Sequence, residues 1–478
     1  MELRTKLLVG GDWVDGADRF ADVNPATEET LAQVHEAGPD QVDAAVRSAR
    51  EALPAWRDLD PHARSVLLWR LADLLEERAA ELAVVETLDN GKPSFESAKV
   101  DLPSVVENFR YYAGWADKLG GETIPVSGPF LNYTLRQPVG VVGAIIPWNF
   151  PLSMAAWKVA PALACGNAVI LKPAEQTPLT ALLLGELALE AGFPAGVLNV
   201  IPGRGPVTGQ ALVEHPGVDK ISFTGSVETG KLIMREAAAT VKNVTLELGG
   251  KSPNVVFADA DLDAAARGAT TGIFYGKGEV CAAGSRLYVE RSVKDAFMEK
   301  LLERTAKMVP GDPTHPKTRL GALVSKEQRD KVLSYIEAGR EEGATLRAGG
   351  EAASVDGRGY FVEATVFDDV DIGMKIAREE IFGPVVAVLE FDGIEDAIRQ
   401  ANQTIYGLAA GVWTRDVGKA HRFAREVQAG TVWVNTYNRY DSASPFGGVK
   451  QSGFGRDLGR YALEQYTETK SVWVALDG

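Results

Sequence analysis

The stretch Val139-Gly140-Val141-Val142-Gly143-Ala144-Ile145-Ile146-Pro147-Trp148-Asn149 decides the fold, because it is a short apolar run that ends in turn-forming and polar residues. Similar runs follow at 168–171, 197–201, 220–223 and 244–248, and segments of helical character lie between them. Short apolar runs that alternate with helices are typical of parallel strands that are buried on both faces and joined by right-handed crossovers. The sequence therefore predicts an α/β fold with a Rossmann-type doubly wound sheet.

Outside this region the sequence indicates further helices and a second α/β unit. Residues 41–56 have the apolar spacing of a helix, and a longer helix is predicted over 60–88. The pattern of short apolar runs begins again at 254–257 and 287–289. We therefore expect a second α/β domain in the C-terminal half of the chain.

The composition is that of a globular protein with an acidic surface. The chain has 478 residues, of which 45% are hydrophobic and 24% charged, and its formal net charge is -15. Nucleic acid and anionic membranes are therefore poor partners. The most apolar stretch, 154–171, contains Lys158, Pro161 and Asn167, so we interpret it as core and not as a membrane span. The N-terminus has no apolar region of signal-peptide length, and we expect a cytoplasmic location.

Cysteine and histidine usage argues against disulfides and against metal catalysis. The two cysteines, Cys165 and Cys281, cannot form a disulfide framework, and the 5 histidines are scattered without ligand spacing. We therefore expect no metal site. Cys165 lies among small apolar residues and is interpreted as a core residue.

Cys281 has a different setting, because it lies in Gly276-Lys277-Gly278-Glu279-Val280-Cys281-Ala282-Ala283-Gly284-Ser285-Arg286, between an apolar run and a strand-like stretch. Earlier in the chain, Glu247 lies near the end of an apolar run and is followed by Gly249-Gly250. A thiol and a carboxylate at adjacent strand ends can share covalent chemistry, one as a nucleophile and the other as a base.

The carboxyl ends of the predicted strands carry polar residues, and ligands of doubly wound sheets collect at this edge. Residues 203–209 fail the dinucleotide fingerprint, since the third glycine is one position late. Phe223-Thr224-Gly225-Ser226 fits better, because Ser226 can cap a helix whose N-terminal amides face a pyrophosphate. Lys172 and Glu175 have two possible roles. They could merely cap the following helix or face solvent, or they could bind ribose hydroxyls. In the second case the carboxylate would repel a 2'-phosphate and favour NAD over NADP.

A series of motifs spans nearly the whole chain and is specific when taken together. In order, the motifs are Thr87-Leu88-Asp89-Asn90-Gly91-Lys92-Pro93, Tyr111-Tyr112-Ala113-Gly114-Trp115-Ala116, Ile146-Pro147-Trp148-Asn149-Phe150-Pro151, Lys172-Pro173-Ala174-Glu175-Gln176-Thr177-Pro178, Phe223-Thr224-Gly225-Ser226, Glu247-Leu248-Gly249-Gly250-Lys251, Glu379-Glu380-Ile381-Phe382-Gly383-Pro384 and Pro445-Phe446-Gly447-Gly448. The chain thereby resembles the NAD(P)-dependent aldehyde dehydrogenase superfamily, most nearly the broad-specificity class that oxidises free aldehydes with NAD.

This resemblance implies an enzyme that oxidises an aldehyde to the free carboxylic acid with NAD. Cys281 matches the nucleophile, which adds to the aldehyde carbonyl to give a thiohemiacetal and then, after hydride has left, a thioester. Glu247 matches the general base that activates the deacylating water. The side-chain amide of Asn149 and the backbone N–H of Cys281 match the oxyanion donors. Lys172 is counted with this catalytic set as well as with the cofactor residues.

The resemblance also implies which residues surround the cofactor and the substrate. Expected around the cofactor are Ile145, Ile146, Pro147, Trp148, Lys172, Glu175, Gly205, Phe223, Gly225, Ser226, Leu248, Gln328, Glu380 and Phe382. The expected substrate wall is mostly aromatic, which suits apolar or aromatic aldehydes, and consists of Phe150, Met154, Trp157, Tyr275, Val280, Ala282, Tyr440 and Phe446. Arg439 and Asp441 flank Tyr440 and could admit a polar tail or face solvent.

The fold of the family implies three parts. They are an NAD-binding domain over 1–118 and 140–249, a catalytic domain over 250–446, and a bridging or oligomerisation segment over 119–139 and 447–478. Residues 130–137 and 470–476 alternate as β-strands do, and exposed strand edges are commonly completed by a second subunit. We therefore expect a homo-oligomer, either a dimer or a tetramer.

Two departures from the family pattern precede the nucleophile. Glu279 stands where much of the family has glutamine, and its carboxylate could raise the thiol pKa or could instead form an ion pair with Lys277. Gly276-Lys277 replaces an Asn-Gln pair of close relatives, which could alter backbone flexibility near Cys281. Two other functions of the same fold also stay open: an acylating enzyme that transfers the acyl group to coenzyme A, and a non-catalytic NAD-binding or structural protein.

Overall fold

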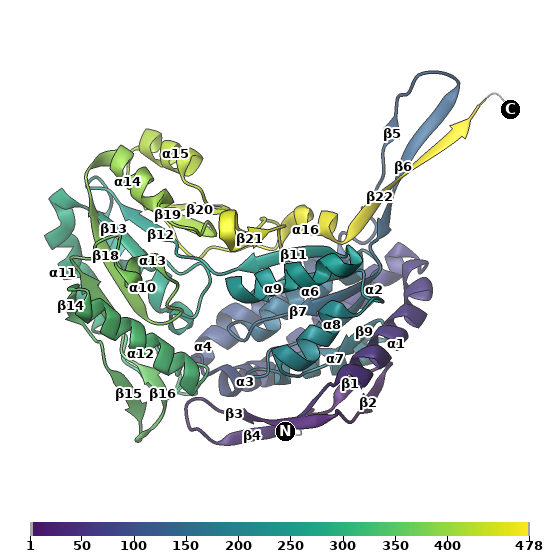
Figure 1. The fold of residues 1–478 in the computed structure, drawn as a ribbon, viewed down its shortest axis with the longest axis horizontal. Helices are drawn as coiled ribbons and strands as arrows, with labels where there is room; N and C mark the ends of the chain where they lie inside the picture. Colours follow the sequence, from purple (N-terminus) through teal and green to yellow (C-terminus); the bar gives the residue numbers. More distant parts are fainter. Residues whose placement is uncertain (1–2, 477–478) are drawn as a thin grey trace.

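The computed structural model describes residues 3–476, which form two large sheets covered by helices and a three-stranded sheet that projects from the body (Figure 1). The first sheet has the order β2-β1-β9-β8-β7-β10-β11-β21, and its five central strands are parallel, as the apolar runs predict. Its strands are β1 (Leu7–Val9), β2 (Asp12–Val14), β7 (Val141–Ile145), β8 (Ala168–Lys172), β9 (Leu198–Val200), β10 (Lys220–Gly225), β11 (Asn243–Leu248) and β21 (Gly453–Phe454).

Helices cover both faces of the first sheet, which is why every residue of β7 is buried. Val141 and Ile145 of β7 belong to the apolar layer under α1, α8 and α9, whereas Val142 and Ala144 belong to the layer under α6 and α7. The helices of this unit are α1 (Pro39–Arg57), α2 (Pro61–Glu77), α3 (Ala79–Asn90), α5 (Leu102–Ala113), α6 (Pro151–Ala164), α7 (Leu179–Ala191), α8 (Gln210–Glu214) and α9 (Val227–Ala237).

The single helix predicted over 60–88 is wrong, because the chain forms α2 and α3 with Arg78 between them. Arg78 has φ -97° and ψ 14°, outside the α-helical range. Its guanidinium forms ion pairs with Glu81 at 2.8 Å and Glu186 at 3.0 Å. Apolar spacing continues through this break, so periodicity alone did not reveal it.

The second sheet has the order β14-β17-β18-β13-β12-β19-β20 and confirms the expected second α/β unit. Its strands are β12 (Pro253–Val256), β13 (Arg286–Glu290), β14 (Thr345–Ala348), β17 (Thr365–Asp368), β18 (Val385–Phe391), β19 (Ala409–Trp413) and β20 (Thr431–Val434). The helices around it are α10 (Leu262–Phe274), α11 (Lys294–Thr305), α12 (Lys326–Glu341), α13 (Lys375–Arg378), α14 (Gly393–Asn402) and α15 (Val417–Glu426).

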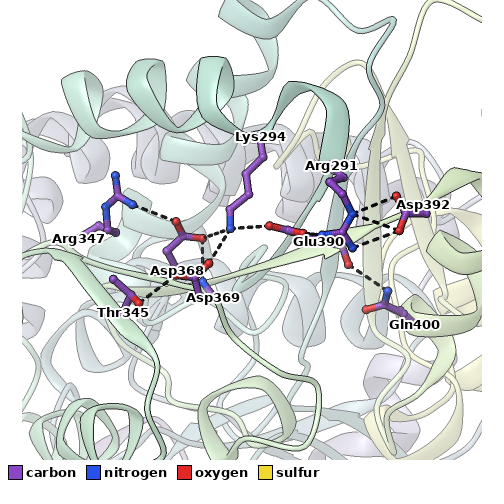
Figure 2. Close-up of polar contacts among 9 residues, drawn as sticks. All are labelled: Arg291, Lys294, Thr345, Arg347, Asp368, Asp369, Glu390, Asp392 and Gln400. Atoms are coloured by element: carbon purple, nitrogen blue, oxygen red, sulfur yellow. Dashed lines mark hydrogen bonds and ion pairs between the residues drawn. The ribbon is translucent and has the colours of Figure 1, made fainter.

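A charge cluster ties α11 to this sheet (Figure 2). The Lys294 ammonium lies 2.9 Å from Asp368, 2.8 Å from Asp369 and 2.7 Å from Glu390. Although burial opposes its charge, these carboxylates raise the pKa of Lys294. Arg291 extends the cluster by pairing with Glu390 and, at 3.1 Å, with Asp392. Lys294 and Arg291 each pair with at least two carboxylates, and these contacts join α11 to β17 and β18.

The third sheet has the order β22-β6-β5 and forms the arm at the upper right of Figure 1. It comprises β5 (Thr123–Ile124), β6 (Phe130–Pro138) and β22 (Thr467–Ala475), so both predicted alternating segments are strands and pair with each other. The segment expected as 447–478 divides differently, because β21 pairs with β11 of the first sheet and α16 (Gly459–Gln465) packs on α6. Only the strand from Thr467 onward belongs to the arm.

The remaining strands and the shortest α-helix are small elements. They are β3 (Asp18–Val23) with β4 (Thr30–Glu36), β15 (Ala352–Val355) with β16 (Arg358–Val362), and the short helix α4 (Ser94–Glu96). Residues 1–2 and 477–478, at the ends of the expected first and third parts, lie outside the described residues. Within the described chain, no helix is long and apolar enough to cross a membrane.

Candidate active site

A cavity of about 680 Å³ is lined by residues of both α/β units, and Cys281 lies in its wall. All of the predicted substrate residues except Ala282 line it, namely Phe150, Met154, Trp157, Tyr275, Val280, Tyr440 and Phe446. Ala282 is not part of this lining. Its side chain is fully buried and its carbonyl accepts a hydrogen bond from the Tyr437 hydroxyl at 2.9 Å.

The aromatic side chains of this wall pack against one another. The ring centre of Phe446 lies 5.6 Å from that of Trp157 and 5.4 Å from that of Tyr440. On the α6 side, the rings of Phe150 and Tyr275 stack at 6.0 Å. Contacts of this kind hold aromatic rings in fixed orientations, so the cavity has a preformed apolar lining.

Sequence reasoning missed a large part of the lining. The missed residues are Phe95, Val100, Asp101, Ser104, Ser153, Ala264, Arg267, Gly268, Thr271, Trp413, Asn435, Thr436, Tyr437 and Asn438. One signal was available, since Ala264, Gly268 and Thr271 are small residues on one face of α10 at helical spacing. The 435–438 loop carries no such signal, because its place depends on the turn that follows β20.

Cys281 is half-buried in the loop between Gly278 and β13. Burial and, to a lesser extent, the nearby carboxylates Glu247 and Glu380 raise the pKa of its thiol to about 12, although two backbone N–H groups act in the opposite direction. The thiol is therefore mainly protonated near neutral pH, and a reaction that uses the thiolate must first remove this proton.

Glu247 lies in β11, where it pairs with Thr224 of β10 and with Gly453 of β21. Its side chain is buried, and neither carboxylate oxygen has a hydrogen-bond partner within residues 3–476. Burial raises its pKa well above 4.5; Asp457 adds to the effect and Lys158 opposes it. The Lys158 ammonium pairs with Asp457 at 3.0 Å. Among the described residues, a buried carboxylate without a partner is free to bind water or a substrate.

Asn149 directly follows β7 and the Trp148 turn, and its amide lies beside the nucleophile loop. The Asn149 Nδ2 group donates to the Glu279 carbonyl at 2.9 Å, which uses one of its two N–H bonds. Its Oδ1 atom is buried and has no partner in the described part of the chain. Among the described residues, the second N–H of Nδ2 has no acceptor and remains available for one.

The alternatives for Glu279 are settled by an ion pair. The Glu279 carboxylate lies 2.7 Å from the Lys277 ammonium, and Cys281 owes its raised pKa to burial and to other carboxylates. The backbone before the nucleophile is left-handed at three successive residues, with φ of 57° at Gly276, 63° at Lys277 and 73° at Gly278. Only glycine adopts such angles without strain, so Lys277 is held there by its contacts.

The predicted ribose residues lie together at the carboxyl end of β8. The Lys172 ammonium is buried, 3.8 Å from Glu175, and donates to the Pro173 carbonyl at 2.9 Å. Burial lowers the pKa of Lys172, although Glu175 and Glu36 oppose this shift. Gly205 is exposed, and a side chain added there would meet nothing within 4 Å. The contact from that segment comes instead from Gly209, where an added Cβ would lie 3.8 Å from Lys172.

The carboxyl end of β10 leads directly into α9, whose N-terminus is capped. Ser226 caps α9 by accepting from the Thr229 N–H at 3.2 Å, as the sequence predicts. Gly225 cannot carry a side chain, because an added Cβ would lie 2.3 Å from the Phe223 ring. Thr224 Oγ1 is buried and lacks a partner among the described residues. Of the remaining cofactor residues, Ile145, Ile146 and Leu248 are buried, whereas Pro147 and Trp148 are half-buried.

A loop of the second unit closes on these strand ends. Glu380 accepts from the Gly250 N–H at 2.9 Å, and burial raises the pKa of Glu380 to about 7. The Phe382 ring meets the Trp148 ring edge-on at 5.2 Å. Phe382 has φ 61°, and its carbonyl accepts from Gln328 Nε2 at 2.6 Å. The Gln328 side chain therefore supports the backbone of the loop that carries Glu380 and Phe382.

The arrangement combines a nucleophile in the wall of an apolar cavity, a buried carboxylate close enough to raise the pKa of that nucleophile, and an amide hydrogen-bonded to the loop two residues before it. These groups can form and hydrolyse an acyl-enzyme. Acidic and polar side chains at the carboxyl ends of β8, β10 and β11 lie where doubly wound sheets bind dinucleotides. Across residues 3–476, no group of three or more His, Cys, Asp or Glu residues has the geometry of a metal site.

Comparisons with known proteins agree with this geometry. The sequence profile described as the aldehyde dehydrogenase family matches residues 13–472. The mitochondrial aldehyde dehydrogenase of Homo sapiens is 50% identical over 475 residues, which cover 98% of this chain and 92% of that protein. Aldehyde dehydrogenase 1A1 of Gallus gallus is 49% identical over 99% of this chain and 94% of that protein. The NAD+ complex of aldehyde dehydrogenase from Bacillus cereus has a TM-score of 0.97 and 51% identity, covering 100% of this chain and 97% of that one.

Proposed function

The chain belongs to the aldehyde dehydrogenase family, a family of oxidoreductases, and from this premise we propose that it oxidises an aldehyde to the free carboxylic acid with NAD. Cys281 is the nucleophile, Glu247 the general base and Asn149 an oxyanion donor. One observation carries the proposal: Cys281 lies in the wall of the apolar cavity, with the unpartnered carboxylate of Glu247 close enough to raise the pKa of the thiol.

NAD fits the strand ends, and when bound it supplies the acceptor for the hydride. The partnerless Thr224 hydroxyl and the capped N-terminus of α9 offer donors to a pyrophosphate. Lys172 and Glu175 offer a donor and an acceptor to ribose hydroxyls, and the Glu175 carboxylate disfavours a 2'-phosphate. Glu380 offers a second ribose contact, and Gly249 leaves room for its carboxylate, since an added Cβ would lie 2.1 Å from it.

In the addition step, the Cys281 thiol loses its proton and its sulfur forms a bond to the aldehyde carbon. The carbonyl oxygen becomes an oxyanion, which the free N–H of Asn149 and the backbone N–H of Cys281 stabilise. Departure of hydride from the same carbon leaves a thioester on Cys281. Because these donors are already in place, they need little reorganisation as the charge develops.

In the deacylation step, Glu247 takes a proton from water, which attacks the thioester carbonyl and releases the acid and the Cys281 thiol. The raised pKa of Glu247 makes its carboxylate a stronger proton acceptor than that of an exposed glutamate. The Lys158–Asp457 pair lies close enough to act on Glu247: Asp457 raises the pKa of Glu247 and Lys158 lowers it.

Steady-state turnover tests the whole sequence. Enzyme, NAD and propanal without coenzyme A should release NADH over many turnovers and yield propanoate. NADH formation that stops after one equivalent and resumes on addition of coenzyme A would favour the acylating alternative. No NADH with short, long or aromatic aldehydes, despite bound NAD, would favour the non-catalytic alternative.

The cavity supports an apolar or aromatic aldehyde as substrate, because the wall near Cys281 is aromatic and apolar. The lining also includes two exposed guanidinium groups, Arg267 and Arg439, for which residues 3–476 provide no ion-pair partner. A panel of matched aldehydes with neutral, anionic and cationic ends, ranked by kcat/KM, tests this choice. The highest value for a neutral apolar or aromatic aldehyde supports the proposal, and a preference for an anionic end would assign the arginines to substrate binding.

A further inference from the structure

The turn before the nucleophile contains a buried ion pair with no role in the chemical steps above. The Lys277 ammonium and the Glu279 carboxylate lie 2.7 Å apart, with side-chain exposures of 1% and 0%. Removal of two charges from water is unfavourable unless further hydrogen bonds compensate each of them. The remaining contacts of the pair therefore indicate what it holds in place.

Lys277 makes three polar contacts. Its ammonium donates to the carbonyl and to the side-chain Oδ1 of Asn90, both at 2.8 Å, and lies at ion-pair distance from Glu279. Asn90 is the last residue of α3 and is fully buried. The ion pair thus joins the nucleophile loop of the second α/β unit to the end of a helix of the first.

The contacts form a closed ring that includes a predicted oxyanion donor. Asn90 Nδ2 donates to the Trp148 carbonyl at 2.7 Å, and the next residue, Asn149, donates to the Glu279 carbonyl at 2.9 Å. The Glu279 side chain returns to Lys277 and also accepts from the Val324 N–H at 3.1 Å. Every link of the ring is a hydrogen bond or ion pair between buried or half-buried groups.

The ring also explains the backbone conformation of Lys277. This residue has φ 63° between two glycines that adopt left-handed angles freely. A lysine in this region is strained, and such strain persists only where the surroundings fix the residue. Three contacts at the ammonium supply that fixation four residues before Cys281.

We propose that Lys277 and Glu279 are positioning residues, whose ion pair sets the Asn149 amide and the Cys281 backbone N–H at the mutual spacing that an oxyanion requires. The inference rests on the proposed function, and it concerns residues that touch neither substrate nor cofactor. Displacement of the ring moves the two oxyanion donors relative to each other. Because the donors act on developing charge, kcat falls while KM for the aldehyde changes little.

Four variants test the proposal in the full-length protein with NAD and propanal. Lys277→Met and Glu279→Gln each leave one buried partner without its counter-charge, whereas the double variant Lys277→Gln/Glu279→Gln replaces the pair by two amides that can bond to each other. Each single variant should lose about 10- to 100-fold in kcat, with KM within about threefold. The kcat of the double variant should recover to within about fivefold of the wild-type value.

Lys294→Met is the matched control, because Lys294 is also a lysine that pairs with carboxylates, although it is only partly buried, and it belongs to the charge cluster of Figure 2. It should lower the thermal midpoint and leave kcat unchanged. A single variant that loses thermal stability but keeps kcat within about threefold of the wild type would assign the pair to packing alone and overturn the proposal. If a single variant does not fold, the double variant decides the question. A folded double variant with a kcat below about a tenth of the wild-type value would also overturn the proposal.

A second readout does not depend on turnover. The Val324 amide, which donates to Glu279, and the amides of 276–281 should exchange hydrogen faster in each single variant than in the wild type. The double variant and Lys294→Met should retain wild-type exchange at these amides. Unchanged exchange in both single variants would overturn the inference. A wild type that forms no NADH would instead contradict the proposed function, and exchange alone would then decide.

Discussion

The Cys281 thiol carries a reactivity that depends steeply on pH. Burial and the neighbouring carboxylates raise its pKa to about 12, so the thiolate fraction grows about tenfold for each pH unit below that value. We expect the rate of Cys281 alkylation by iodoacetamide, without cofactor, to rise continuously from neutral to alkaline pH. Mass spectrometry of the modified peptide measures it site by site.

Glu247→Gln provides the comparison for this pH profile. The carboxylate of Glu247 raises the pKa of the thiol, so its removal should shift the alkylation profile toward lower pH. A wild-type rate that reaches a plateau below about pH 9 would contradict the burial of the thiol. An unshifted profile in the variant would place Glu247 too far from Cys281 to act on it.

The division of labour between Cys281 and Glu247 predicts different defects in two variants. Cys281→Ala should abolish NADH formation, because no thiohemiacetal forms. Glu247→Gln should still release about one equivalent of NADH per active site and then stall, since acylation proceeds but water is not activated. Stopped-flow fluorescence of NADH separates burst from steady state. Full steady turnover by the glutamine variant would remove Glu247 from the role of base.

At the scale of elements, the strands were predictable and several contacts between distant elements were not. Continuous apolar runs gave β7, β8, β10 and β11 closely, because strands buried on both faces have no alternation to obscure them. The break between α2 and α3 is not visible in the apolar spacing, and one of the contacts that accompany it, the ion pair of Arg78 with Glu186, joins residues 108 positions apart. Similarly, β21 consists of two residues and is defined by its partner β11.

The candidate site divides in the same way. Motifs predicted the residues that surround Cys281, whereas the cavity lining from α10 and the 435–438 loop was not anticipated. The Lys277–Glu279 pair was weighed as one of two alternatives, and only the buried geometry selected it. A sequence pattern specifies the residue type needed at a strand end, but the packing of loops from two units determines the shape of the cavity.

The attachment of α11 gives a prediction about stability. Lys294→Met removes the cation between Asp368, Asp369 and Glu390 and leaves three carboxylates close together. Since these groups are only partly buried, we expect a loss of about 1–3 kcal/mol in the free energy of unfolding. The urea midpoint measures the loss. Lys307→Met, which breaks an exposed i,i+4 pair with Glu303, should leave the midpoint unchanged. Equal midpoints for Lys294→Met and the wild type would refute the argument.

At the scale of the whole molecule, the projecting arm predicts self-association. Its strands expose large apolar side chains far from the core of the subunit, including Phe130 at 43%, Trp473 at 59% and Val474 at 41%. Exposed apolar groups on open strand edges are commonly covered by a second copy. We therefore predict a homo-oligomer, a dimer or tetramer of the 51.2 kDa chain, measurable by size-exclusion chromatography with light scattering.

Trp473→Glu should shift this equilibrium toward smaller species, because it places a charge in the apolar face of β22. Trp69→Glu is the matched control, since Trp69 is also exposed, at 43%, but lies on α2 in the body. It should keep the wild-type mass. A wild type that elutes as a monomer at micromolar concentration, or an equal loss of mass in both variants, would contradict an interface at the arm.

The pairing of β21 with β11 orders the events of biosynthesis. Glu247 lies near the middle of the chain, yet its strand is flanked on one side by Gly453, which a ribosome adds more than 200 residues later. The edge of the first sheet therefore stays open during translation, and the base acquires its buried surroundings only when the polypeptide is nearly finished. A premature stop codon after residue 446 would therefore yield a chain that contains Cys281 but lacks the strand that flanks Glu247.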